Sequence, residues 1–235
     1  MGVTTAAKQR SLGSLRRSLM IRSGAAAGAS FGYEIFDEFL KDAQRQLYTL
    51  VDWKHLVNDN IQPVNIGEKW YDLPDDCDLE RILSVTYRIN GSSRWNGAMS
   101  YGIPLALRSV NINGYPYLYE TRNNHDAPSG VVNPVQIELY PVVQKAGQLR
   151  VEYVKKLQPF ESDNDTATLP DDLILLHALY NSKSHFNRPD AQSIASQLEA
   201  MLGRARSQHR KISVVHRAPV NGMLPEDLSY LYPPV

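Results

Sequence analysis

The chain has 235 residues, of which 43% are hydrophobic, and its formal net charge at pH 7 is zero. This length allows one elaborated domain or two small ones, with a sizeable core. The single cysteine, Cys77, excludes an internal disulfide framework and a multi-thiolate zinc site. No apolar run approaches the roughly 20 residues that span a bilayer, so no membrane partner is expected.

Charges of one sign gather at both ends of the chain. Before Glu34, and again between Glu199 and Glu226, the sequence contains no acidic residue. The basic residues of these two segments are Lys8, Arg10, Arg16, Arg17 and Arg22, then Arg204, Arg206, Arg210, Lys211 and Arg217. Such ends are typical of segments that meet something negative, either an acidic protein surface or nucleic acid.

The first elements in chain order are two helices. Leu12, Leu15 and Leu19 recur at helical spacing and predict a short helix over 11–22, followed by the small-residue loop GAAAGAS. An arginine-rich, acid-free start is also compatible with a mitochondrial transit peptide, and we favour the amphipathic helix. A longer helix is predicted over 33–57. Its apolar positions are Phe36, Phe39, Leu40, Ala43, Leu47, Leu50 and Trp53.

From about 63 to 157 the sequence changes to short runs rich in β-branched and aromatic residues. The candidate strands are EKWYDLP, RILSVTYRIN, PLALRSV, YPYLYET, VQIELYP and QLRVEYVKK, separated by the turns NGSS, NGYP, APSG and KAG. In the last strand Leu149, Val151 and Tyr153 alternate with polar residues. Several strands without an intervening helix predict an antiparallel sheet or a small barrel.

Two more helices are predicted, over about 170–186 and 189–211. Asp171 and Asp172 lie in the first turn of the former, where negative charge suits the helix dipole. The apolar positions of the second helix are Ile194, Leu198, Met201, Leu202 and Ala205. A basic cluster at its end comprises Arg204, Arg206, Arg210 and Lys211.

After residue 212 the sequence is proline-punctuated and apolar, too hydrophobic for a typical disordered tail and too short to build its own core. An extended arm that docks on something else is the favoured interpretation, and folding back on its own domain is the alternative. The candidate docking residues are Val214, Val215, Arg217, Met223, Leu224, Leu228, Tyr230, Leu231 and Tyr232.

The elements together predict an α+β protein. We expect a helical bundle made of residues 1–62 and 158–211, an antiparallel β insert over 63–157, and the arm over 212–235. The two helical parts are separated in sequence by the insert but are expected to form one bundle.

No pattern in the sequence supports catalysis. His177 and His185 are eight positions apart, which places them about 80° apart around a helix, and HExxH is absent. Asp72, Asp75, Asp76, Asp78 and Glu80 lie in a loop that lacks EF-hand spacing. The formal GxSxG at GASFG, with Ser30, follows a small-residue loop and not a strand. A metal-dependent hydrolase is therefore a minor hypothesis, and we expect no enzyme, metal or cofactor.

Three stretches together resemble a known family. They are SLGSLRRSLMIRSG leading into FLKDAQRQLYTLVDWKHL, then KWYDLPDDCDLERILSV, then QLRVEYVKKLQPFESDNDTATLPDDLILLHALYNSKSHFNRPDAQSIASQLEAML. In this order and spacing, over roughly 11–207, the chain resembles the head-to-tail adaptor (connector) proteins of tailed bacteriophages. Its organisation is also similar to that of tubular tail protein A of short-tailed phages.

The resemblance implies a structural role. Such adaptors form a typically dodecameric ring beneath the portal protein, lengthen the DNA channel, and give the tail or nozzle protein a place to attach. The arm, Ile212–Val235, is then expected to dock on the portal. The implied location is the head–tail junction of the virion, after assembly in the host bacterial cytoplasm, with genomic DNA passing through the lumen without sequence-specific binding.

Two sets of residues are assigned roles on this basis. The helix residues expected at contacts between subunits are Phe36, Leu40, Leu47, Trp53, Leu173, His177, Leu198 and Leu202. The basic cluster is expected to meet an acidic portal surface in preference to DNA, because its cations are few and lack interleaved aromatic residues. A sequence-tolerant DNA-binding protein acting through its basic ends is the alternative function.

Overall fold

The computed structural model describes residues 9–24, 32–123 and 135–209, which fall into two compact units. The helical unit comprises the described residues up to Lys54 and from Leu157 onward, and the β unit comprises those of His55–Lys156. The α+β class expected from the sequence is confirmed. The boundary expected at 62 falls inside strand β1, Val57–Val64.

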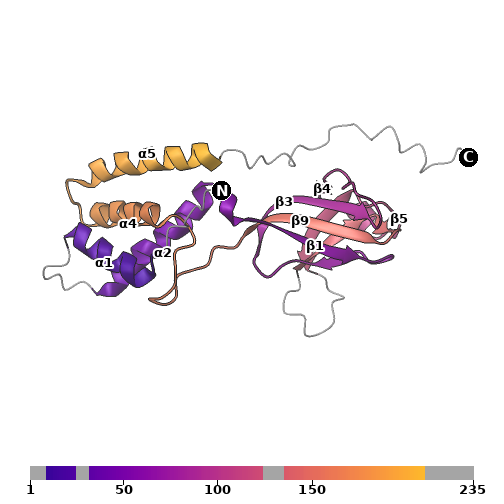
Figure 1. Cartoon of the computed structure of the whole chain (residues 1–235), viewed down its shortest axis with the longest axis horizontal. Helices are drawn as coiled ribbons and strands as arrows, with labels where there is room; N and C mark the ends of the chain where they lie inside the picture. Colours follow the sequence, from indigo (N-terminus) through magenta and orange to yellow (C-terminus); the bar gives the residue numbers. More distant parts are fainter. Residues whose placement is uncertain (1–8, 25–31, 124–134, 210–235) are drawn as a thin grey trace, which may run out of the picture. The chain divides into compact units, whose positions relative to one another are not determined.

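The helical unit is organised around one buried helix. Its elements are α1 (Leu12–Ser23), α2 (Tyr33–Leu50), α4 (Asp171–His185) and α5 (Ala191–His209). Helix α4 packs against the other three, with α5 on one side and α1 and α2 on the other (Figure 1). Three leucines of α1 are buried, as are four of the predicted apolar positions of α2, which confirms the 3.6-residue periodicity. Of the other predicted positions within α2, Phe39 is half-buried and Leu50 is exposed.

Helix α2 ends at Leu50, well before the predicted residue 57. Val51 has an extended backbone with φ −135° and ψ 138°, and a 3-10 turn, η2, follows at Lys54–Leu56. The fully buried Trp53 folds back under the last turn and its Nε1 donates to the Leu47 carbonyl at 3.0 Å. Trp53 thus fits the helical apolar spacing but terminates the helix.

The residues expected at subunit contacts lie inside one chain. Phe36, Leu40, Leu47, Trp53, Leu173, His177 and Leu198 are buried and Leu202 is half-buried. Because the seven buried side chains pack within their own helical unit, a neighbouring subunit cannot reach them. A contact between subunits through these helices is therefore expected at their exposed positions, and of the eight predicted residues only Leu202 is partly accessible.

Ion pairs join the start of the chain to the segment that leads into α4. Arg10 contacts Asp171, at 2.7 Å, and Asp172. Arg16 contacts Asp37 at 2.5 Å and Asp163 at 2.6 Å. Asp171 and Asp172 therefore pair with Arg10 as well as suiting the dipole of α4. Asp37 of α2 and Asp163 hold Arg16 of α1.

The β unit contains two main sheets. The first has the order β1–β9–β3, with β9 at Gly147–Lys155 and β3 at Cys77–Ile89. The second has the order β2–β7–β6–β4, whose strands are Trp70–Asp72, Val135–Tyr140, Leu118–Asn123 and Ser100–Tyr101. A small pair joins β5 (Asn113–Gly114) and β8 (Val142–Val143). Both β4–β6 and β5–β8 are parallel, whereas the other pairs are antiparallel as expected.

The prediction of a strand at PLALRSV, residues 104–110, is wrong. Its residues form the short helix α3, Leu105–Arg108. Arg108 closes this turn, because its Nε donates to the Ile103 carbonyl at 3.2 Å and its Nη2 contacts Glu120 at 2.7 Å. The predicted alternation of β9 is confirmed, with Leu149, Val151 and Tyr153 buried in the β core.

Candidate partner-binding site at the end of helix α5

Helix α5 is the least covered helix of the helical unit. Of its residues only Leu198 is buried, while Ile194, Met201 and Leu202 are half-buried against α4. Most helical stability comes from packing an apolar face, so a helix covered on one side only leaves the opposite side available to a partner.

The C-terminal end of α5 is held next to the end of α2. The Lys54 backbone N–H donates to His209 Nδ1 at 3.2 Å, and Lys54 Nζ donates to the Gln208 carbonyl at 2.7 Å. The Trp53 and His209 rings meet edge to face, with centroids 5.2 Å apart. This clamp, formed by Trp53, Lys54, Gln208 and His209, fixes the last turn of α5.

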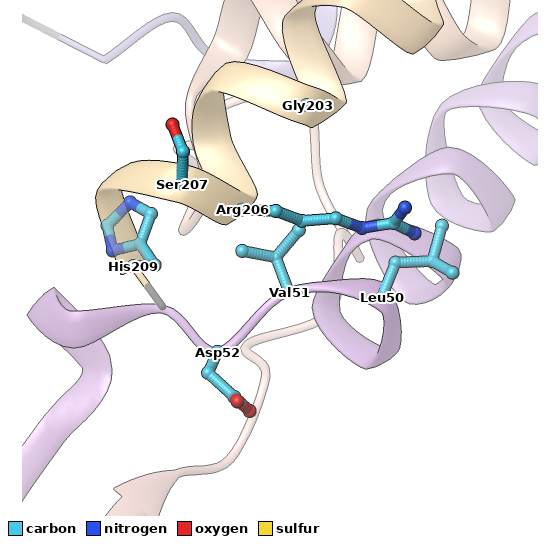
Figure 2. Close-up of a pocket in the computed structure, with 7 residues that line it drawn as sticks. All are labelled: Leu50, Val51, Asp52, Gly203, Arg206, Ser207 and His209. Carbon is cyan, nitrogen blue, oxygen red and sulfur yellow. The ribbon is translucent and has the colours of Figure 1, made fainter. Parts of the chain in front are cut away.

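A hollow of about 520 Å³ lies beside the clamp. It is lined by Leu50, Val51, Asp52, Gly203, Arg206, Ser207 and His209. Figure 2 shows the Arg206 side chain reaching from α5 toward Leu50, while the Asp52 carboxylate points away from the hollow. Leu50 is 42% exposed, so the hollow combines an apolar wall with a cation. Such a surface suits a partner segment in which an apolar side chain lies near a carboxylate.

The two described members of the predicted basic cluster, Arg204 and Arg206, do not share one side of α5. Arg204 and Arg206 are both exposed, but two positions on a helix differ by about 200°, so the two side chains leave α5 on nearly opposite sides. Only Arg206 lines the hollow. Arg210 and Lys211 lie outside the described residues, as do the arm residues Val214, Val215, Arg217, Met223, Leu224, Leu228, Tyr230, Leu231 and Tyr232.

The two histidines of α4 differ in their burial and in their neighbours. His177 is buried, and burial lowers its pKa from the ordinary 6.5. His185 lies at the exposed end of α4, with its ring 5.6 Å from that of Phe39. Among the residues that the structure describes, no group of three or more histidine, cysteine or carboxylate side chains is arranged to hold a metal ion.

The aspartate loop before β3 is tied to the β unit itself. Asp76 accepts a hydrogen bond from the Tyr153 hydroxyl at 2.7 Å and lies 3.4 Å from Lys155 Nζ. Cys77 is buried, and burial, reinforced by Asp78, raises the pKa of its thiol to about 12. A thiol held protonated at neutral pH is a poor nucleophile, as expected from the neighbouring aspartates.

Neither the clamp nor the hollow was predictable from local sequence patterns. Trp53 matched the apolar stripe of α2, and no local pattern connects Lys54 with His209, which are 155 positions apart.

Within the described part of the chain, no helix is both long and apolar enough to cross a membrane.

Comparison with known families adds the decisive observation. The family model described as SU10 adaptor protein matches residues 10–221. The chain belongs to this family. It is a family of structural bacteriophage adaptors and not an enzyme family, and an adaptor is a component of the virion. Phage adaptors in general interact with portal and tail proteins. None of the curated proteins matches the chain. The likeness to tubular tail protein A stays a prediction.

Proposed function

We propose that this adaptor assembles as a ring, expected to be dodecameric, below the portal, where it joins the capsid to the tail and extends the DNA channel. The observation that carries the proposal is membership of the SU10 adaptor family, which covers residues 10–221. The uncovered side of α5 and the clamped end of that helix give the ring and the portal contact a physical basis.

Ring formation suits the helical unit. In a closed ring each subunit offers one face and accepts a different one, so a helix packed on one side only is a suitable contact element. The exposed side of α5 carries small and polar residues, among them Ser196, Ala200, Gly203 and Ser207. Small side chains allow a neighbouring helix or strand to approach closely.

The portal contact is assigned to the arm, Ile212–Val235. The arm begins three positions after His209, whose ring is held by the clamp. A fixed last turn gives the following segment a defined starting point and lowers the entropy lost when an extended segment binds. Apolar residues punctuated by prolines are suited to docking in an extended conformation on a preformed surface.

DNA is proposed to pass through the lumen without specific binding. The segment between Glu34 and Glu199 contains most of the acidic residues. A channel lining that bound phosphates tightly would slow the passage of DNA, so an acidic body suits transit.

The experiment that tests the portal contact uses two variants. One ends after Lys211, and the other replaces residues 212–235 by a Gly-Ser segment of equal length. Both should keep the helical circular-dichroism signal and lose binding to purified portal rings. Portal binding by either variant at the affinity of the full chain would refute the assignment of the arm.

Duplex DNA binding by the same proteins distinguishes the proposed function from the alternative of a DNA-binding protein. A sequence-tolerant DNA-binding protein would bind duplex DNA tightly, with affinity falling steeply as salt rises. We expect only weak duplex binding by the isolated chain. Tight, salt-dependent binding to duplex DNA, together with none to the portal, would favour the alternative.

A further inference from the structure

The β unit exposes a group of large apolar side chains. They are Ile66, Tyr101, Leu105, Val110, Ile112, Tyr115 and Tyr117, and their exposed fractions range from 42% to 78%. Six of the seven come from residues 101–117. We name this set the aliphatic–tyrosine surface. When large exposed apolar side chains lie on neighbouring segments, the surface they form marks an interaction site more often than a solvated surface.

Backbone hydrogen bonds join the segments that carry this surface. The Val142 N–H donates to the Ile112 carbonyl at 2.8 Å, and the Gly67 N–H donates to Val143 at 2.9 Å, which places Ile66 beside the same strand. The Ser100 N–H donates to the Tyr117 carbonyl at 2.9 Å. These bonds join the segments that carry the surface to the strand pairs β4–β6 and β5–β8. Figure 1 labels β4 and β5 within the β unit.

Two tyrosines of the surface are supported from below by buried rings. Tyr101 meets Tyr119 edge to face at 5.4 Å between centroids, and Tyr117 meets Tyr140 at 6.4 Å. Tyr119 and Tyr140 are buried in the β unit. A preformed aromatic surface loses little entropy on binding, which is the usual property of a protein-docking face.

The segment that carries most of this surface is basic in sequence, whereas Glu68 lies two positions from Ile66 and Glu120 pairs with Arg108. From Arg81 to Tyr119 the sequence contains no acidic residue and four arginines, at 81, 88, 94 and 108. Lys145 Nζ lies 5.9 Å from the Tyr115 ring. The complementary partner is therefore a protein face with apolar side chains bordered by carboxylates.

Nucleic acid fits this surface less well. Leu105, Val110 and Ile112 offer no ring on which a base could stack. Two of the arginines are also engaged within the chain, because Arg88 donates to Gln148 and lies 4.4 Å from the Trp95 ring, and Arg108 pairs with Glu120. The aliphatic share of the surface favours a protein.

We infer that the aliphatic–tyrosine surface is the docking face for the tail protein, through apolar side chains bordered by carboxylates on that partner. This inference rests on the proposed function, which assigns the portal contact to the arm that follows the helical unit. The β unit then supplies a second, chemically different surface for the second partner of a head-to-tail adaptor.

The test combines Leu105→Asp with Ile112→Asp in the full chain. Both side chains are exposed, Leu105 at 78%, so the fold should be kept. The matched control is Ile21→Asp, at a residue of the helical unit that is 63% exposed. Binding of each protein to the purified tail protein and to the purified portal of the same phage is measured separately.

The double variant should bind the tail protein about 100-fold more weakly, as expected for two central contact residues, and the portal unchanged. Ile21→Asp should bind both partners like the unaltered chain. Lys145→Glu should slow association with the tail protein about tenfold.

Unchanged tail binding by the double variant, or loss of portal binding in its place, would overturn the inference alone. Self-association of the unaltered chain that the double variant abolishes would assign the surface to a second copy and also overturn it. If the unaltered chain bound neither portal nor tail protein, both the inference and the proposed function would fail.

Discussion

Helices α4 and α5 are neighbours of similar length with opposite roles. Helix α4 has 15 residues and buries eight of them, whereas α5 has 19 and buries one. Apolar residues occupy nearly all sides of α4 and only one stripe of α5. We infer from this burial that α4 contributes more than α5 to the stability of the helical unit, and we propose that the exposed side and the clamped end of α5 contact partners.

The largest difference in the free energy of unfolding should appear when one leucine of each helix is replaced by alanine. Leu175 in α4 is fully buried, so Leu175→Ala should lower the free energy of unfolding by about 2–5 kcal/mol. Leu202 in α5 is half-buried, and Leu202→Ala should cost less than about 1.5 kcal/mol. Urea unfolding followed by circular dichroism measures both. Equal losses would show that α5 is as much a part of the core as α4.

A smaller difference in the free energy of unfolding is expected when an arginine paired with α4 and an arginine of α5 are each replaced by alanine. Burial alone would raise the pKa of Asp171, but the hydrogen bond and charge of Arg10 outweigh it and lower that pKa. Arg10→Ala should therefore cost about 1–2 kcal/mol at neutral pH. Because a lowered carboxyl pKa stabilises the fold above its ordinary value of 3.8, this cost should shrink as pH falls below that value.

Arg204 in α5 is the matched control for Arg10. It is exposed, and Arg204→Ala should change the free energy of unfolding by less than about 0.5 kcal/mol. The same urea titrations at pH 7 and pH 3.5 compare the two variants. A pH-independent cost of Arg10→Ala would refute the role of its ion pairs at the start of α4.

His177 should make the stability of the α4 core depend on pH. Burial lowers its pKa below 6.5, so the unfolded chain binds the proton more readily and stability should fall as pH drops from 7 to 5. His177→Leu should reduce that dependence, whereas the exposed His185→Gln should leave it in place. Thermal unfolding across this range measures it. An unchanged slope in His177→Leu would show that another group is responsible.

The smallest effect on stability, with a clear effect on binding, is expected at the end of α5. Arg206→Glu should change the free energy of unfolding by less than about 0.5 kcal/mol and weaken portal binding about tenfold. Arg204→Glu, on nearly the opposite side of the helix, should bind the portal more strongly than Arg206→Glu does. Equal weakening by both would indicate a diffuse charge effect and not a contact at the hollow.

Local sequence pattern predicted the helices well. Helices expected over 11–22, 170–186 and 189–211 occur at Leu12–Ser23, Asp171–His185 and Ala191–His209. Their apolar spacing and flanking prolines act within a few residues, so one sequence is enough to locate them. The absence of a catalytic pattern agrees with a family of structural adaptors.

Features that depend on distant residues were not predictable. Trp53 has the right spacing to extend α2, yet the helix ends at Leu50 and the buried Trp53 ring packs against that of His209, 156 positions later in the chain. Residues 104–110 look like a strand, but Arg108 closes a helical turn through Glu120. The aliphatic–tyrosine surface comes from residues that read equally well as buried strands, because periodicity does not show which face is covered.

Whether the chain forms a ring on the portal can be decided by measuring the mass of the complex. Purified portal rings mixed with excess adaptor, with the unbound chain removed, should gain a fixed multiple of the 26.5 kDa chain, expected to be twelve. The complex with the variant that ends after Lys211 should not form. Portal rings that gain no mass in the presence of the full chain would contradict the account.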